Sequence, residues 1–185
     1  MRRFAFLLAV LASFISVQFP AHANIGSTAI PRLAVSGGFT APVGFQIFCL
    51  SHPGHCRGGG ASEAQLTEAL MSTLGAVNAR VNRSIRPRHE STDTWSLGVT
   101  SGDCEDYVLA KRAMLIGMGV PASALRIAIA NTRQGIGHAV LVVRTDRGDL
   151  VLDNLTSQIL PSDRTSLRWV AMTGDNGRTF HRIVS

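Results

Sequence analysis

The chain has 185 residues, of which 18 are lysine or arginine, 12 are acidic and three are cysteine. This length suits one domain with a sizeable core. The basic excess is mild, and the densest basic run, Arg80 to Arg88, contains no aromatic residues, so we expect no nucleic-acid partner. That run favours a solvated connecting segment, with a docking surface for a protein partner as the alternative.

Residues 1–23 predict a secretory signal peptide. Met1-Arg2-Arg3 precedes an apolar run from Phe4 to Val17, and Ala21-His22-Ala23 is a small-x-small cleavage site. The run is shorter than the roughly 20 residues that span a bilayer, so we expect no transmembrane segment after cleavage. Without Arg2 and Arg3, 16 of the 18 basic residues remain against 12 acidic ones, a net charge of +4. We expect a periplasmic or secreted protein in which residues 24–185 form a single domain.

The first part of this domain predicts a loop followed by a disulfide. Residues 24–48 are rich in Gly, Pro, Ala and Ser and have no sustained period, which favours an extended lead-in. Cys49 and Cys56 flank a Pro53-Gly54 turn, and in an oxidising compartment they are expected to form a disulfide. The alternative is a metal site that would combine both cysteines with His52 and His55.

Two helices are predicted. The first begins at Ser62, with Gln65 in the capping-box position, and its apolar face carries Leu66, Leu70, Leu74, Val77 and Val81. Residues 82–100 are expected to be irregular, and Trp95 either walls a cleft or packs in the core. The second helix runs from Cys104 to Met118, with Asp103 as N-cap, and its predicted buried stripe is Tyr107, Val108, Leu115 and Met118.

The rest of the sequence has a strand pattern. Strands are expected at residues 125–130, 138–144, 149–155, 167–172 and 179–184. Helices followed by a run of antiparallel strands predict an α+β fold, in which the helix that starts at Cys104 packs on the sheet.

Cys104, His138 and Asp153 are the candidate catalytic residues. A cysteine at a helix N-terminus is favoured as a thiolate by the amide dipoles, His138 opens a strand behind a Gly-rich turn, and Asp153 ends the next strand. In a hairpin whose loop has an even number of residues, the numbers of two paired residues add up to an odd value. Because 138 and 153 add up to 291, the two side chains are expected on one face of the sheet, within one diagonal step.

The carboxylates around Cys104 oppose a thiolate. Asp103, Glu105 and Asp106 would raise the pKa of the thiol through like charge. A hard cation such as calcium, bound by Asp103 and Glu105, would neutralise them. The alternative is that they are ordinary acidic residues of a first helical turn.

The sequence resembles the bacterial transglutaminase-like cysteine proteinases. The matching blocks are Asp93-Thr94-Trp95, Gly102-Asp103-Cys104-Glu105-Asp106-Tyr107, the Leu-Ala-Lys-Arg of residues 109–112, Gly137-His138-Ala139-Val140-Leu141 and Val151-Leu152-Asp153-Asn154-Leu155. The resemblance implies a transglutaminase-core, papain-like fold, a Cys104–His138–Asp153 triad and calcium binding by Asp103 and Glu105. Since the best-known relatives are periplasmic proteases that clip a surface adhesin, it also implies a cell-surface protein substrate and a regulatory protein partner.

We therefore predict an exported cysteine peptidase that works through a thioester acyl-enzyme, with calcium as an effector and no organic cofactor. Two alternatives stay open at this point. One is transglutaminase-type transfer of the acyl group to an amine, and the other is a non-catalytic module that binds a partner through calcium at the helix start.

Overall fold

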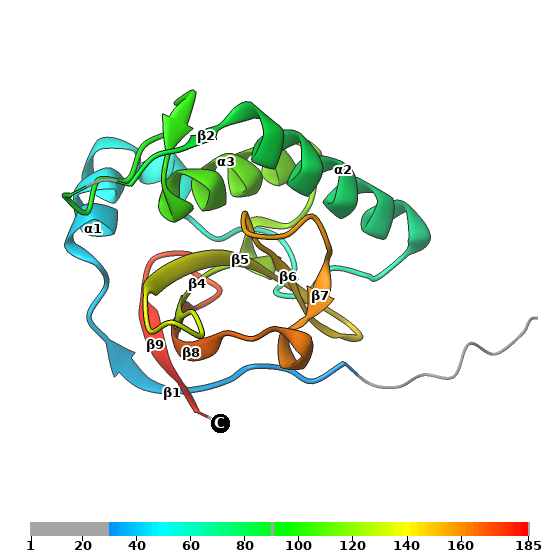
Figure 1. The fold of residues 1–185 in the computed structure, drawn as a ribbon. Helices are drawn as coiled ribbons and strands as arrows, with labels where there is room; N and C mark the ends of the chain where they lie inside the picture. The colour runs from blue at the N-terminus through cyan, green and yellow to red at the C-terminus, as the bar shows by residue number, and fades with distance from the viewer. Residues whose placement is uncertain (1–29, 90, 185) are drawn as a thin grey trace, which may run out of the picture.

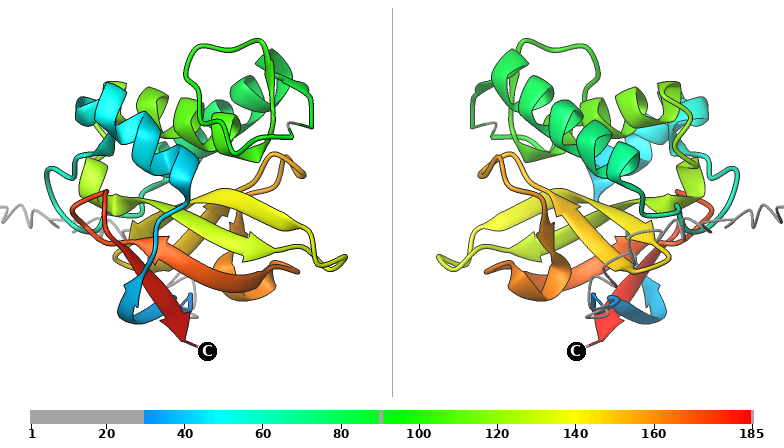
Figure 2. Two further views of the ribbon diagram at one scale, coloured as in Figure 1. Left: turned by 90° about the vertical axis from the view of Figure 1, so that its left-hand side faces the viewer. Right: turned by 90° about the vertical axis from the view of Figure 1, so that its right-hand side faces the viewer.

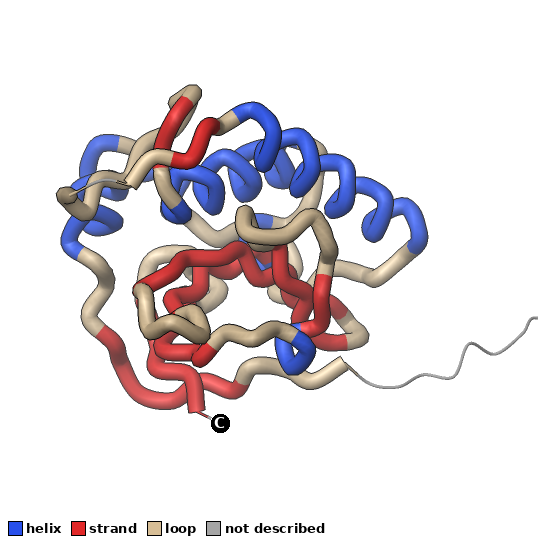
Figure 3. Tube along the Cα trace, viewed as in Figure 1, coloured by secondary structure: helices blue, strands red, loops and turns tan. Residues whose placement is uncertain are grey.

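The computed structural model describes residues 30–89 and 91–184, and the predicted signal peptide lies outside them. Within these residues the helices lie on one side of a curved antiparallel sheet, as Figure 1 and the secondary-structure colouring of Figure 3 show. The helices are α1 (Val43–Ser51), α2 (Glu68–Ser84) and α3 (Cys104–Gly117). The predicted α+β class is confirmed. No helix in this described part of the protein has the length and apolar character needed to span a bilayer.

The main sheet has the strand order β1-β9-β8-β4-β5-β6-β7, and every neighbouring pair is antiparallel. Its strands are β1 (Ala34–Phe39), β4 (Leu125–Asn131), β5 (Gly137–Thr145), β6 (Gly148–Leu152), β7 (Leu160–Pro161), β8 (Arg168–Thr173) and β9 (Phe180–Val184). A short parallel ladder joins β2 (Arg86–Pro87) to β3 (Ser101–Gly102). The five predicted strands therefore correspond to β4, β5, β6, β8 and β9.

Strand β5 lies at the centre of the core because both of its faces are covered. Ala139, Leu141 and Val143 pack toward the helices, while Val140 and Val142 belong to a smaller cluster on the opposite face. Successive side chains of a strand point to opposite faces, so a continuous apolar run is what a doubly covered strand requires. The two side views in Figure 2 show the helical layer on one side of the sheet. A rigid central strand thus carries His138 near its start.

The predicted loop over residues 24–48 is wrong for its described part. Strand β1 pairs with β9, although the two strands lie near opposite ends of the described chain, and Ala34 is opposite Val184. Helix α1 follows directly after Pro42. The Gly-rich sequence of β1 has weak local strand preference, so its structure depends on a partner that no local pattern identifies. The short α1 is held instead by burial of Phe45 and Phe48.

Asp93 and Trp95 hold α1 in place. The Asp93 carboxylate accepts hydrogen bonds from the Gly44 backbone amide at 2.7 Å and from Trp95 Nε1 at 2.8 Å. Trp95 is buried and packs edge-on against Phe45, with ring centroids 5.1 Å apart. Of the two interpretations of Trp95, the core residue is therefore correct.

Helix α2 begins later than predicted. Its N-cap is Thr67, whose hydroxyl accepts a hydrogen bond from the Leu70 amide at 3.1 Å, and Ser62 lies in the preceding segment. That segment is held by Ala64, which forms an isolated bridge with Thr145 of β5. Tertiary pairing overrides the capping-box pattern here. The helix also continues to Ser84, into the stretch that was expected to be irregular.

Helix α3 has the predicted start and nearly the predicted end. Asp103 occupies the N-cap position, although its side chain makes no capping hydrogen bond, and Gly119 adopts a left-handed φ of 88° just past the last turn. Three members of the predicted buried stripe are buried, whereas Met118 is 56% exposed. Met118 already lies in the unwinding C-cap, which turns it away from the core.

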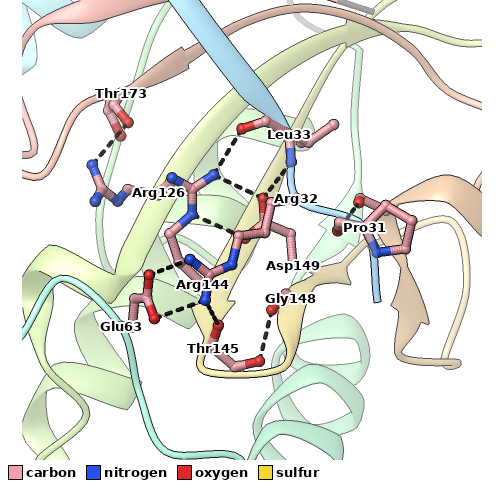
Figure 4. Close-up of polar contacts among 11 residues, drawn as sticks. Pro31, Arg32, Leu33, Glu63, Arg126, Arg144, Thr145, Gly148, Asp149 and Thr173 are labelled. Carbon is pink, nitrogen blue, oxygen red and sulfur yellow. Dashed lines mark hydrogen bonds and ion pairs between the residues drawn. The ribbon is translucent and has the colours of Figure 1, made fainter. Parts of the chain in front are cut away.

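A polar network closes the end of the β5–β6 hairpin farthest from His138 (Figure 4). Buried Asp149 accepts from the Leu33 amide at 2.8 Å and pairs with Arg144 at 2.9 Å, and Arg144 also donates to the Leu33 carbonyl. Arg32 pairs with Glu63 nearby at 2.8 Å. These bonds fasten the segment before β1 across the hairpin turn. A buried charge is tolerated there because every Asp149 oxygen is bonded.

Candidate active site

Cys104 is the first residue of α3 and is partly buried. It lines a pocket of about 210 Å³ together with His138, Asp103 and Arg88. The helix packs against β5, which brings the sulfur to the start of that strand. The two residues that the sequence proposed as nucleophile and base therefore line one pocket, although they are far apart in sequence.

His138 and Asp153 are in direct contact. The Nε2 atom of His138 lies 2.8 Å from Oδ1 of Asp153, and both side chains are largely buried. In the β5–β6 hairpin, Leu141 lies opposite Leu152 and Thr145 opposite Gly148, so paired numbers add up to an odd value. The parity prediction is confirmed, with the two residues one diagonal step apart. Because Nε2 faces the carboxylate, Nδ1 is the ring nitrogen left for a thiol proton.

Strand β6 ends at Leu152 rather than at the predicted Leu155. The Asp153 carboxylate turns the backbone by accepting a hydrogen bond from the Leu155 amide at 3.0 Å. Aspartate commonly makes such a bond with the backbone two residues on, which breaks the strand ladder. Burial alone raises the pKa of Asp153, but its hydrogen bond to His138 and the charge of that ring hold the pKa below its ordinary value. Asp153 is therefore ionised at neutral pH.

Two asparagines of α2 hold the segment that follows β6. Asn82 Nδ2 donates to the carbonyls of Asp153 at 3.0 Å and Thr156 at 3.2 Å, and Asn78 donates to those of Thr156 and Ser157. The sequence interpretation missed this role. A signal was present, since Asn78 and Asn82 interrupt the apolar face of the first predicted helix at i, i+4 spacing.

Lys111 lies below the site with no exposed surface. Its Nζ has no hydrogen-bond partner within the described residues and sits 5.9 Å from the centroid of the Tyr107 ring. Burial lowers the pKa of Lys111 to about 7, while the negative charge of Asp153 opposes that decrease. The lysine shares one helix face with Cys104 and supplies positive potential toward Asp153.

The Cys104 thiol is held in its protonated form by its surroundings. Its Sγ donates to Oε2 of Glu105 at 3.2 Å. Burial, followed by the charge of Glu105, raises the pKa of Cys104 to about 12, and the backbone amide of Ala139 opposes this increase. The helix dipole invoked from sequence is therefore outweighed by desolvation and by a neighbouring carboxylate.

The carboxyl groups of Asp103 and Glu105 face each other at the start of α3. Burial and the hydrogen bond to Asp103 raise the pKa of Glu105 to about 7. Oδ1 of Asp103 is buried and accepts no hydrogen bond from any described residue. Two converging carboxyls with an unbonded oxygen fit a hard cation such as calcium. Residues 30–89 and 91–184 contain no cluster of three or more His, Cys, Asp or Glu side chains that could hold a metal ion.

The third carboxylate, Asp106, has a structural role. It is buried and accepts a hydrogen bond from the Ser96 amide at 2.8 Å. A Cβ atom at position 102 would lie 1.9 Å from Asp106 Oδ2, so any residue larger than glycine would displace this carboxylate. This contact gives a structural reason for the glycine at position 102 and the aspartate at position 106, on either side of Cys104.

Cys49 and Cys56 are joined in a disulfide. Their sulfurs are therefore not available as ligands for the alternative metal site with His52 and His55. Buried Arg112 supports the disulfide loop by donating to the carbonyls of His55 at 2.6 Å and Arg57 at 2.9 Å. The remaining cysteine of the sequence, Cys104, is free.

Comparison with known proteins agrees with this geometry. Residues 35–183 match the family model described as bacterial transglutaminase-like cysteine proteinase BTLCP. The chain belongs to this family. The match runs from β1 to β9 and includes Cys104, His138 and Asp153, so the contacts described above are those of a bacterial transglutaminase-like cysteine proteinase.

Solved structures of LapG from Legionella pneumophila are similar to this proteinase. The calcium-bound form shares 28% identity and a TM-score of 0.53, over 57% of this chain and 65% of that one. An EGTA-treated form shares 30% identity with a TM-score of 0.52, over 56% and 63%. The chain thus spans slightly less than two thirds of the length of these relatives. No curated protein sequence matches it significantly.

Proposed function

We propose that this protein is an exported cysteine peptidase with Cys104 as nucleophile, His138 as base and Asp153 as the group that orients the imidazole. The observation that carries this proposal is the 2.8 Å contact between His138 and Asp153 in a site that also contains the free thiol. An oriented base beside a nucleophile is the arrangement that activates a thiol. Membership of a cysteine proteinase family supports the same assignment.

The reaction follows from the two ring nitrogens of His138. Nδ1 takes the thiol proton as Cys104 Sγ attacks the peptide carbonyl carbon, and Nε2 stays bonded to Asp153. The tetrahedral oxyanion is stabilised by backbone amides near Cys104. His138 then gives its proton to the leaving amine, which departs and leaves a thioester on Cys104. Water, deprotonated by His138, attacks the thioester, and the carboxylate product departs as the thiol is restored.

Calcium is the proposed effector, held by Asp103 and Glu105. Bound there, the cation would supply positive charge that offsets the two carboxylates. Neutralising Glu105 removes a cause of the raised pKa of Cys104, which makes proton transfer to His138 easier. The existence of LapG in calcium-bound and EGTA-treated forms supports a calcium role in this family.

The substrate is proposed to be a protein, with a cell-surface protein as the expected class and a regulatory protein as a further partner. Residues 1–23 are proposed to direct export, so that residues 24–185 work as one domain in the periplasm or outside the cell. The open pocket at Cys104 is compatible with an extended polypeptide.

The test is to incubate the mature protein with candidate surface proteins, with calcium or with EGTA, beside a Cys104→Ala variant. Cleavage that needs Cys104 and increases with calcium is the expected result. A parallel reaction with a glutamine peptide and a labelled amine separates hydrolysis from acyl transfer, since label incorporation without cleavage would establish a transglutaminase. If Cys104→Ala kept full activity, the nucleophile would be misassigned, and calcium-dependent binding without any chemistry would favour the docking-module alternative.

A further inference from the structure

A larger pocket of about 430 Å³ adjoins the proposed catalytic site on the side of Asp153. One wall contains Asp153 and Leu155, and Leu155 also lines the pocket that holds Cys104 and His138. Its other walls come from the turn between β4 and β5, at residues 132–134, and from residues 164–167 before β8. The two pockets thus share a wall, and a bound polypeptide could extend from one to the other across Leu155, which is 66% exposed.

The pocket is positively charged. Arg133 and Arg164 line it from two different loops, and both are exposed. Neither forms an ion pair with any residue in the described ranges. The guanidinium of Arg168 borders the same turn, since it lies 3.6 Å from the position that a Cβ on Gly135 would occupy.

Little negative charge offsets these arginines. Asp153 is the acidic residue of the lining, and its carboxylate already binds His138. Exposed Asp163 is adjacent to Arg164 in sequence but does not line the pocket. Threonine, serine and glutamine side chains complete a wall rich in hydrogen-bond donors, among them Thr132, Thr156, Gln158, Thr165 and Ser166. A guanidinium group suits a carboxylate because its planar fork can donate two parallel hydrogen bonds to the two carboxylate oxygens.

The chemistry of the proposed reaction fixes which part of a substrate reaches this pocket. His138 must protonate the leaving amine, so the substrate segment that follows the scissile bond leaves on the histidine side of the sulfur. Nδ1 of that ring serves the thiol and Nε2 faces Asp153. The pocket beyond Asp153 therefore adjoins the leaving-group side of the cleft.

We propose that this pocket, through Arg133 and Arg164, binds an acidic side chain located C-terminal to the scissile bond of the substrate. This inference rests on the proposed peptidase function and names the substrate class that the enzyme prefers. Binding of that side chain would make the enzyme selective for acidic segments of proteins. The positive charge of Arg168, beside the same turn, would also attract such segments.

The test uses internally quenched peptides that differ only in having Asp or Asn at single positions C-terminal to the cleaved bond. The wild-type enzyme should cleave one or more of the Asp peptides with higher kcat/KM than the matched Asn peptide. Arg133→Gln combined with Arg164→Gln should reduce that preference by about tenfold. Arg147→Gln, at the opposite end of the β5–β6 hairpin, is the matched control and should leave the preference unchanged.

A second substrate separates this pocket from the catalytic residues. A peptide whose leaving group is aminomethylcoumarin lacks the C-terminal segment, so the double variant should hydrolyse it as fast as the wild type does. Equal cleavage of Asp and Asn peptides, or an equal loss on the coumarin substrate, would overturn the inference and leave the peptidase proposal intact. Absence of any Cys104-dependent cleavage would overturn both.

A binding measurement adds a readout that needs no turnover. The fluorescent C-terminal product peptide with Asp should bind the Cys104→Ala protein more tightly than its Asn counterpart does. That difference should disappear when Arg133 and Arg164 are also replaced by Gln, with the melting temperature showing that the variant is folded. Equal affinity of the two peptides for Cys104→Ala would contradict the proposal.

Discussion

His138 and Asp153 contact each other at 2.8 Å across one diagonal step of the β5–β6 hairpin, although they come from opposite sides of its turn. The hairpin register brings the two residues together. The Leu155 amide donates a hydrogen bond to the same carboxylate oxygen of Asp153, which fixes the orientation of that side chain. Their mutual orientation is therefore built into the backbone before any substrate binds, which is the condition for a preorganised base.

Replacing Asp153 by Ala should lower kcat/KM by roughly 10²-fold to 10⁴-fold, because the imidazole loses its orienting partner. Asp153→Asn keeps a hydrogen-bond acceptor without the charge, so it should retain more activity than Asp153→Ala. Asp163→Asn on the exposed turn before β8 is a matched control and should be neutral. Peptide kinetics at equal folded protein, checked by circular dichroism, measure these differences. An Asp153→Ala enzyme as active as the wild type would rule out the assigned role.

Glu105→Gln should increase the reactivity of Cys104 when calcium is absent. Burial and the charge of Glu105 raise the pKa of Cys104 to about 12, so removal of the charge lowers the pKa and leaves more thiolate at any pH below it. Iodoacetamide labelling rates measured from pH 7 to pH 10 in EGTA should shift to lower pH. Asp163→Asn again serves as the control. A rate that is unchanged or slower in Glu105→Gln would contradict this electrostatic account.

Asn82→Ala should reduce catalysis more than Asn78→Ala does. Asn82 donates directly to the Asp153 carbonyl, whereas Asn78 holds only the following residues, Thr156 and Ser157. Without the Asn82 bond, Asp153 can shift and orient the His138 imidazole less well, so we expect kcat to fall about tenfold. The stability cost is expected to be larger for fully buried Asn78. If both variants lost activity only in proportion to their loss of folded protein, neither asparagine would be a positioning residue.

Lys111→Met should change how stability depends on pH. The pKa of Lys111 is lowered to about 7 by burial, below the value of about 10.4 that an unfolded lysine has. Between these values the unfolded protein binds more protons, so the stability of the wild type rises with pH from about 7 to 10. The variant lacks this titration, and its free energy of unfolding should be less dependent on pH in that window. Urea denaturation at pH 6.5 and pH 9.5 measures the difference. If the free energy of unfolding changed by the same amount between these two pH values in the wild type and the variant, Lys111 would not titrate there.

Replacing both Cys49 and Cys56 by Ser should cost about 2 kcal/mol of stability, because the short covalent ring no longer restricts the unfolded protein. The disulfide is remote from the proposed chemistry, so Cys104 labelling at 25 °C should keep its wild-type rate. Reduction of the wild type under mild conditions should lower its urea midpoint to that of the double variant. A labelling rate that changed with the disulfide would indicate that α1 supports the active site.

Local sequence was sufficient to predict the features that depend on nearby residues or on counting. The helix predicted from Cys104 to Met118, with Asp103 as N-cap, follows from capping preferences and from the spacing of its apolar residues. The common face of His138 and Asp153 follows from the period of two in strands and an even turn. These features need only sequence neighbours, or one hairpin, to be specified.

Contacts between distant segments determined the remaining features, which no local pattern could predict. Strand β1 exists because β9 pairs with it, and α2 starts at Glu68 because Ala64 is drawn to β5. The three carboxylates near Cys104 look alike in the sequence, yet packing assigns Asp106 to Gly102 and Ser96 and turns Asp103 and Glu105 toward each other. The sequence set the helix dipole against these carboxylates, and burial decided the balance by raising the pKa of the thiol further, since desolvation depends on what covers a group and not on its neighbours in sequence.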